Sequence, residues 1–174
     1  MKIISVSRDS NIPIPDFDLD SSIGGKRVKT SDFRQQQNLV IYFYEAWSCD
    51  HCRRMLRELR DHHELFKWLD AKVLAISRDQ LGEISIAAAD LGPEMLLLSD
   101  EDGKVTSAYA RMGDEGGEVK NSFMVIADRF GTLFSWMGME TDENIDYGEV
   151  ESTLLFIATQ CPECGRPQGD SIAM

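Results

Sequence analysis

Apolar residues along this chain fall into short runs that are bounded by polar or glycine-containing turns. Short apolar runs of this kind are typical of strands buried in a sheet. We expect such strands over residues 39–44, 72–77, 95–98, 122–127 and 132–137. Elsewhere apolar residues recur at every third or fourth position, which is the spacing of an amphipathic helix. This spacing predicts one helix that begins at Cys49–Cys52 and continues to Leu69, and further helices near residues 81–91, 105–112 and 149–160.

The order of these elements predicts the fold class. Strands alternate with helices in the first half of the chain, which is typical of parallel strands joined by crossovers, whereas residues 122–137 read as an antiparallel hairpin. We therefore expect a three-layer α/β domain over residues 1–160, with a central mixed β-sheet flanked by helices. Residues 1–37 read as an appended N-terminal β extension, and residues 161–174 as a C-terminal tail. A length of 174 residues fits a single domain.

Two cysteines, Cys49 and Cys52, stand between the first core strand and its helix. A Cys-x-x-Cys pair in this position indicates redox chemistry, because the two thiols can close a small disulfide ring with little rearrangement. Cys49 is expected at or just before the first helical turn, where free backbone N–H groups and the helix dipole favour a thiolate. Cys52 is expected one turn further in and more covered. A buried structural pair or a zinc-binding pair is the alternative.

Residues around the pair could tune its reactivity. His51 would favour a thiolate at Cys49 if it were charged, whereas Asp50 would disfavour one. Glu45 could be a buried base that exchanges a proton with Cys52, or equally a solvated turn carboxylate. His62 and His63 are expected on the polar side of the helix, without a chemical role.

Composition and charge argue against some classes of binding partner. The formal net charge of -12 argues against binding nucleic acid or an anionic membrane surface. No apolar run reaches membrane-spanning length, and the first residues do not read as a signal peptide. We expect a cytoplasmic protein, in which a reducing pool keeps exposed cysteines as thiols.

Several phrases, in this order and spacing, resemble the redoxins, the thioredoxin-fold family of peroxiredoxins, alkyl hydroperoxide reductase and thiol-specific antioxidant proteins. The matching phrases are residues 14–19, 25–26, 31–34, 73–77, 97–104 and 123–131, together with the cysteine pair. This resemblance implies a thioredoxin-like fold and antioxidant or thiol–disulfide chemistry.

The resemblance also implies roles for single residues. In the peroxiredoxin pattern Pro-x-x-x-Thr-x-x-Cys, Glu45 takes the place of the proline, Cys49 of the threonine and Cys52 of the peroxide-attacking cysteine. The arginine that polarises the peroxide falls near Lys120, which keeps the charge but lacks the planar fork. In the thioredoxin pattern, Trp47 precedes the pair with one extra residue between them.

A second pair, Cys161 and Cys164, lies in the tail and looks like one knuckle of a zinc ribbon. Tetrahedral zinc usually needs four ligands, so two tails of a homodimer could share one ion. The tail pair could instead pass electrons to Cys49 and Cys52, or belong to a plain flexible tail.

Three functions follow as hypotheses. The leading one is a thiol–disulfide oxidoreductase, in which Cys49 attacks a disulfide or oxidised thiol of a protein substrate and Cys52 resolves the intermediate. The second is a thiol-dependent peroxidase, in which a hydroperoxide oxidises Cys52. The third is a non-catalytic redoxin-fold module that assembles through tail-bound zinc. The first two require no cofactor, and the sequence does not identify the reducing partner.

Overall fold

A computed structural model describes residues 2–5, 11–113 and 122–160 of the chain. Within these ranges the strands are β1 (Lys2–Ser5), β2 (Asp18–Ser21), β3 (Arg27–Lys29), β4 (Asn38–Phe43), β5 (Ala71–Ser77), β6 (Leu96–Ser99), β7 (Ser122–Ala127) and β8 (Leu133–Met139). The α-helices are α1 (Asp50–Asp61), α2 (His63–Trp68), α3 (Leu81–Leu91), α4 (Lys104–Gly113) and α5 (Tyr147–Thr159), and a 3-10 turn covers Thr30–Phe33.

The described strands form one eight-stranded sheet in the order β1-β8-β7-β4-β5-β6-β2-β3. Strands β4, β5 and β6 are parallel, whereas β7 runs antiparallel to β4 and β8 antiparallel to β7. The mixed sheet predicted from the order of elements is therefore confirmed. Strand β4 is buried along its whole length because it lies inside the sheet with both faces covered, which explains its continuous apolar sequence.

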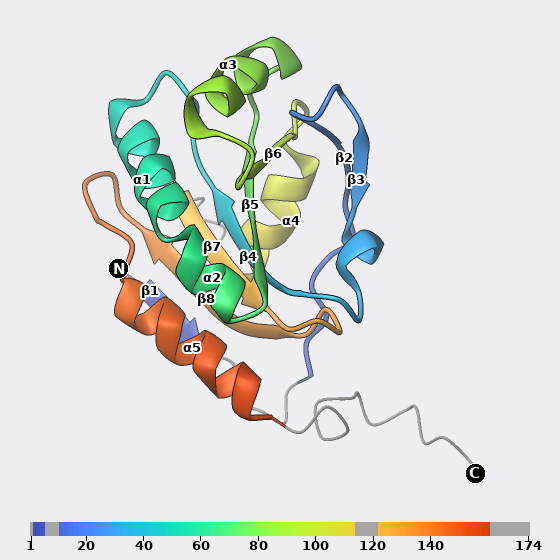
Figure 1. The fold of residues 1–174 in the computed structure, drawn as a ribbon, viewed down its shortest axis with the longest axis vertical. Coiled ribbons are helices and arrows are strands. Elements are labelled where there is room, and N and C mark those ends of the chain that lie inside the picture. Colours follow the sequence, from blue (N-terminus) through green and yellow to red (C-terminus); the bar gives the residue numbers. More distant parts are fainter. Residues whose placement is uncertain (1, 6–10, 114–121, 161–174) are drawn as a thin grey trace.

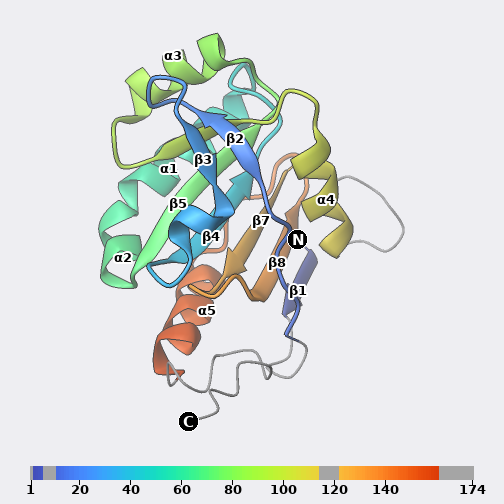
Figure 2. The same ribbon diagram turned by 90° about the vertical axis from the view of Figure 1, so that its right-hand side faces the viewer.

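Helices cover both faces of the sheet, as Figures 1 and 2 show. One core contains buried residues of α1, α2, α3 and α5, and the other contains residues of α4 and of the chain before β2. Alternate residues of β4 enter the two cores, with Tyr42 in the first and Phe43 in the second. The three-layer arrangement predicted from the sequence is confirmed.

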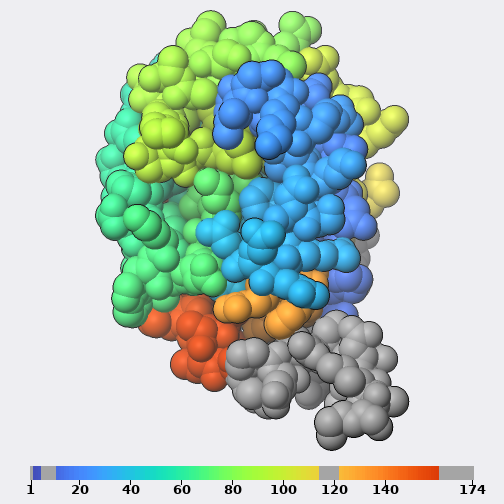
Figure 3. Space-filling model, turned by 45° about the vertical axis from the view of Figure 1, so that its right-hand side comes forward, coloured from blue at the N-terminus to red at the C-terminus, as the bar shows by residue number. Residues whose placement is uncertain are grey.

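The N-terminal segment does not form a separate appended layer. Strand β1 pairs with β8 at one edge of the sheet, and the β2–β3 hairpin extends the other edge beyond β6. The hydroxyl of Tyr109 in α4 donates a hydrogen bond to the carbonyl of Pro15 at 2.6 Å, which fastens the connecting segment to the domain. Figure 3 shows the hairpin at the surface beside α3.

The helix expected from the cysteine pair to Leu69 is interrupted at His62. This residue ends α1 and precedes α2, with ψ near 10° instead of a helical value. The apolar spacing continues across the break because both helices pack on the same core. None of the described helices is long and apolar enough to cross a membrane.

Candidate functional site

The cysteine pair lies at the start of α1, close after the carboxyl end of the central strand β4 (Figure 1). Ligand and reaction sites of open α/β sheets gather at this edge. Cys49 is the N-cap residue of α1, and Cys52 lies in its first turn. The placement predicted for both cysteines is confirmed.

Cys49 is half-buried, and its sulfur is the cap of the helix. The backbone N–H of Cys52 donates to Cys49 Sγ at 3.3 Å. A sulfur at this position receives an otherwise unpaired N–H and the positive end of the helix dipole, and both interactions favour its anionic form. Cys49 is therefore the better placed of the two thiols for nucleophilic attack.

Cys52 has the opposite environment. Only 3% of its surface is exposed. Burial raises the pKa of the Cys52 thiol to about 11, and contact with Cys49 adds to the rise, while the backbone amides of Ala46 and Glu45 oppose it. At neutral pH Cys52 is a protonated thiol held directly beside its partner.

The charged residues that follow Cys49 are held in specific contacts. Arg53 pairs with Asp50, donates to the carbonyl of Trp47 at 3.0 Å, and places its guanidinium 5.9 Å from the centre of the indole ring. The charge of Asp50 is thus matched locally, and Trp47 packs against the same core as the two cysteines.

His51 links the start of α1 to the segment before α5. Arg54 donates to His51 Nδ1 at 3.0 Å, so this nitrogen accepts, and Nε2 carries the hydrogen that is donated to the carbonyl of Glu143 at 3.0 Å. This ring therefore orients the first turn of α1.

Glu45 is exposed. The interpretation of Glu45 as a buried base is therefore wrong, and the alternative, a solvated carboxylate in the turn, describes its position. The turn places its side chain outward because the chain leaves the buried strand β4 at this point. Lys120, predicted to take the place of a peroxide-polarising arginine, lies outside the described residues.

A buried carboxylate near the pair was missed by the sequence analysis. Asp79 is 8% exposed, and its Oδ2 accepts the N–H of Trp47 at 2.7 Å and the hydroxyl of Ser77 at 3.1 Å. Asp79 is the second residue after β5, the parallel neighbour of β4, so its place at the carboxyl edge could have been predicted from the topology. It holds the turn that leads into Cys49.

Two tyrosines at the carboxyl end of β4 were also missed, Tyr42 inside the strand and Tyr44 one residue beyond it. Tyr42 and Tyr44 belong to the same core as Cys52, and neither hydroxyl has a hydrogen-bond partner of good geometry among the described residues. Burial raises the pKa of both hydroxyls, and the neighbouring Cys52 adds to the rise. Their period-two spacing along this extended segment places them on one face, which is the signal that could have found them.

His62 is not an inert residue of a polar helix face. It is half-buried, and its ring stacks on Tyr147 of α5 with 3.8 Å between ring centres. His51 and His62 therefore hold α1 against the segment from Glu143 to Tyr147 at both ends of the helix.

The tail cysteines Cys161 and Cys164 lie outside the described residues, so their zinc site stays a prediction. Within residues 2–5, 11–113 and 122–160, no group of three or more His, Cys, Asp or Glu side chains is arranged to hold a metal ion.

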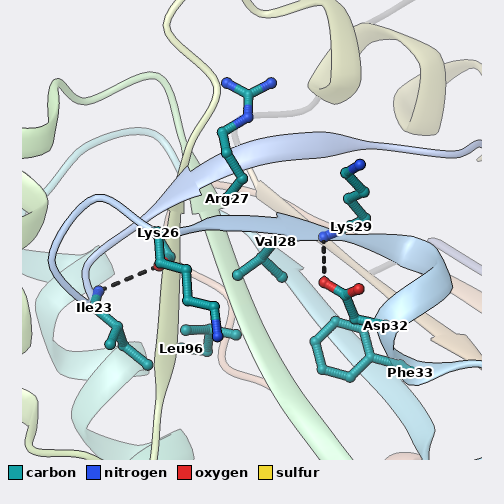
Figure 4. Close-up of a pocket in the computed structure, with 9 residues that line it drawn as sticks. Ile23, Lys26, Arg27, Val28, Lys29, Asp32, Phe33 and Leu96 are labelled. Atoms are coloured by element: carbon teal, nitrogen blue, oxygen red, sulfur yellow. Dashed lines mark hydrogen bonds between the residues drawn. The ribbon is translucent and has the colours of Figure 1, made fainter.

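A cavity of about 440 Å³ opens at the β2–β3 hairpin (Figure 4). Its wall includes Lys26, Lys29, Asp32 and Phe33. The N–H of Lys29 donates to Asp32 at 2.9 Å, which closes the turn on one side of the cavity. No cysteine lines it.

Comparison with known proteins gives a consistent result. A model of the AhpC/TSA family matches residues 11–133. Chloroplastic peroxiredoxin Q of Gentiana triflora is 30% identical over 109 residues, which are 63% of this chain and 43% of that protein. Chloroplastic peroxiredoxin Q of Triticum aestivum is 29% identical over 119 residues, which are 68% of this chain and 54% of that protein. The chain thus spans about half the length of these curated relatives.

Solved structures share the fold. Peroxidoxin BcpB from Mycobacterium tuberculosis matches with a TM-score of 0.70 and 21% identity, over 87% of this chain and 97% of that one. AhpC of Enterococcus faecalis matches with a TM-score of 0.70 and 21% identity, over 87% of this chain and 98% of that one.

Proposed function

Because the chain belongs to the AhpC/TSA family, we propose that it is a thiol-dependent oxidoreductase in which Cys49 and Cys52 cycle between two thiols and one disulfide. The observation that carries this proposal is the asymmetry of the two sulfurs. Cys49 is half-buried and caps a helix, whereas Cys52 is buried, has a raised pKa and donates its N–H to Cys49. An accessible attacking sulfur next to a covered resolving sulfur is what thiol–disulfide exchange requires.

The leading reaction is exchange with a disulfide of a protein substrate. The Cys49 thiolate attacks one substrate sulfur, and the other leaves as a thiolate that takes a proton from solvent. Cys52 then attacks Cys49 Sγ, so that the bond to the substrate breaks and the Cys49–Cys52 disulfide forms. The substrate leaves reduced, and an external dithiol of still unidentified nature restores the pair. These steps use sulfur chemistry alone and require no cofactor.

A thiol peroxidase is the second candidate, and the relatives named peroxiredoxin Q favour it. In this reaction Cys52, at the position of the peroxide-attacking cysteine, takes an oxygen from a hydroperoxide and becomes a sulfenic acid, and an alcohol or water leaves. Cys49 then attacks Cys52, and water leaves as the disulfide forms. This order makes Cys52 the first nucleophile.

Single-cysteine variants separate the two candidates. We expect turnover of insulin disulfides with a dithiol reductant to be lost in Cys49→Ser and retained in Cys161→Ser. Rapid consumption of hydroperoxide that needs Cys52 but survives Cys49→Ser for one turnover would instead support the peroxidase. A chain with neither activity, and with zinc that is lost in Cys161→Ser, would support the non-catalytic module. We further propose a cytoplasmic location, in which the reducing pool would keep the pair as thiols.

A further inference from the structure

One peptide group joins a buried carboxylate to the backbone of Cys49. The N–H of Trp47 donates to Asp79 Oδ2 at 2.7 Å. The carbonyl of Ala46 belongs to the same peptide group, and it accepts the N–H of Cys49 at 3.2 Å. In a planar trans peptide group the N–H and the carbonyl point in opposite directions. A rotation of this group would therefore break both hydrogen bonds together.

Asp79 is itself fixed to the edge of the sheet. It is 8% exposed, and it follows β5, which ends at Ser77. The hydroxyl of Ser77 accepts the N–H of Asp79 at 3.3 Å and donates to Asp79 Oδ2 at 3.1 Å. The hydroxyl of Ser99, at the end of β6, donates to the carbonyl of Asp79 at 2.6 Å. Asp79 is thus held at the carboxyl ends of two parallel strands.

The next peptide group is held from the side of the helix. Arg53 lies in α1, and its guanidinium donates to the carbonyl of Trp47 at 3.0 Å. The same guanidinium pairs with Asp50 and lies 5.9 Å from the centre of the Trp47 ring. Both backbone polar groups of Trp47 are therefore bound by charged side chains, Asp79 at the sheet edge and Arg53 in the helix.

The position of the Cys49 sulfur depends on this turn. The sulfur accepts the N–H of Cys52 at 3.3 Å, and the backbone of Cys49 is extended, with φ -76° and ψ 118°. An N-cap side chain reaches the N–H groups of its helix from a backbone of this kind. The bond from the N–H of Cys49 to Ala46 holds that backbone on the side of the turn. A turn without its bond to Asp79 would leave the sulfur less firmly placed at the helix start.

Resting on the proposed function, we propose that Asp79 is a positioning residue for Cys49, which holds the attacking sulfur at the start of α1 by accepting the N–H of Trp47. In this role Asp79 acts as a hydrogen-bond acceptor and takes no proton from either cysteine. Its Oδ2 already receives two hydrogens, one from Trp47 and one from Ser77. Misplacing a reacting group by about 1 Å can slow a reaction by about a hundred-fold, so the position of the sulfur matters to its rate of attack.

The attack of Cys49 can be measured in the full chain with Cys161 and Cys164 replaced by serine. The reduced protein is mixed with the aromatic disulfide dithiobis(nitrobenzoate), and the Cys49 thiolate releases one coloured thiolate as it forms a mixed disulfide. Asp79→Ala removes the acceptor, and we expect it to slow this first release by at least about ten-fold near pH 7. Asp79→Asn keeps an oxygen that can accept both bonds, so its rate should stay within about three-fold of the wild type.

Asp100 offers a matched control. It is a buried carboxylate, 1% exposed, directly after β6 at the same edge of the sheet. Its oxygens accept the N–H groups of Val105 and Thr106, so its bonds go to α4 and not to the turn before Cys49. Asp100→Ala also removes a buried, hydrogen-bonded carboxylate. We expect it to lower the free energy of unfolding while the first release changes by less than about two-fold.

The asparagine variant separates positioning from proton transfer. If Asp79 acted as a base, Asp79→Asn would be as slow as Asp79→Ala near pH 7, and both would recover as the pH rises. Positioning predicts instead that the rate of Asp79→Asn follows the wild-type rate at each pH.

Amide exchange tests the turn itself, without a reaction. The N–H groups of Trp47 and Cys49 are bonded, whereas the N–H of the exposed Ser48 between them has no partner among the described residues. In the wild type we expect the amides of Trp47 and Cys49 to exchange at least about ten-fold more slowly than that of Ser48. Asp79→Ala should remove the protection of Cys49, and Asp100→Ala should not.

A wild-type rate of first release in Asp79→Ala, or equal rates in Asp79→Ala and Asp79→Asn, would overturn the positioning role. Unprotected amides at Trp47 and Cys49 in the wild type would overturn it even if Asp79→Ala did not fold. A wild-type chain whose first release is no faster than that of Cys49→Ser would instead contradict the proposed function.

Discussion

The backbone N–H of Cys52 donates a hydrogen bond to the sulfur of Cys49 at 3.3 Å, so the two residues are already in contact before a disulfide forms. The bond stabilises negative charge on Cys49. The same closeness raises the pKa of Cys52, in addition to the larger effect of burial. This contact thus favours Cys49 as the attacking sulfur and Cys52 as the resolving sulfur.

The rates of alkylation of Cys49 and Cys52 should differ accordingly. With a pKa of about 11, only about one Cys52 thiol in 10⁴ is ionised near pH 7. We expect iodoacetamide to modify Cys49 first, and Cys52 in Cys49→Ser to react at least about a hundred-fold more slowly than an ordinary exposed thiol. Peptide mass spectrometry at timed intervals measures both rates. Equal rates for the two cysteines in the folded chain would contradict the assigned roles.

Stability at alkaline pH gives a second prediction. The folded chain holds the Cys52 proton more tightly than the unfolded chain, because burial raises the Cys52 pKa from about 9 to about 11. Its contribution to stability is therefore full below about pH 9 and is lost as the pH rises toward 11.

We expect the free energy of unfolding of the wild type to fall faster between these two pH values than that of Cys52→Ala. Urea titrations measure the difference. Burial raises the pKa of Tyr42 and Tyr44 in both proteins, and the variant loses only the smaller contribution of Cys52 to these two pKa values. If the free energy of unfolding fell equally with pH in the two proteins, burial would not raise the pKa of Cys52.

Removing the carboxylate of Glu45 should have little effect. This side chain is exposed in the turn before Cys49. Glu45→Gln is therefore expected to keep the rate of insulin-disulfide reduction within about two-fold of the wild type, since it contributes no buried base. Loss of activity in this variant, with the fold retained by circular dichroism, would restore the role first considered from the sequence.

The close contact of α4 with β8 can be tested at Gly113. A Cβ atom at this position would overlap the indole of Trp136, whose Nε1–H donates to the carbonyl of Tyr109 at 3.1 Å. Gly113→Ala must push the helix or the indole aside, and we expect it to lower the free energy of unfolding by about 1–3 kcal/mol. Gly82→Ala, where nothing lies within 4 Å of the new atom, is the matched control and should not destabilise the chain.

The features that could be predicted from the sequence are those that depend on a local pattern of residues. The buried strand β4 and the N-cap position of Cys49 were predictable, because a continuous apolar run and the start of helical spacing mark them. The contact of Trp47 with Asp79 depends on the register of two parallel strands and joins residues 32 positions apart. Such a contact follows from tertiary packing, which periodicity does not report.

His62, at the C-terminal end of α1, shows the same limit. His62 was expected on a polar face because its neighbours in sequence are charged, yet Tyr147 of α5 covers its ring. The break between α1 and α2 was missed for a related reason, since both helices present apolar residues to one core. Burial by a distant element, and not local propensity, decides both features.

The last prediction concerns the contact of His51 with Glu143. His51 joins the first turn of α1 to the segment before α5 through bonds of 3.0 Å to Arg54 and to the Glu143 carbonyl. His51→Ala removes both bonds, and we expect it to lower the free energy of unfolding by about 1 kcal/mol. It should also increase hydrogen exchange at the amide of Cys52, because the first turn loses its anchor.

His63→Ala is the matched control, since the hydrogen bond and ion pair of His63 go to nearby residues, the carbonyl of Arg60 and the carboxylate of Glu64. We expect it to leave exchange at Cys52 unchanged. Amide exchange followed by NMR in both variants makes the comparison. If His51→Ala and His63→Ala have the same effect at Cys52, the link to Glu143 does not hold the turn in place, and the orientation of Cys49 depends on its other contacts, among them the bonds of Trp47 to Asp79 and Arg53.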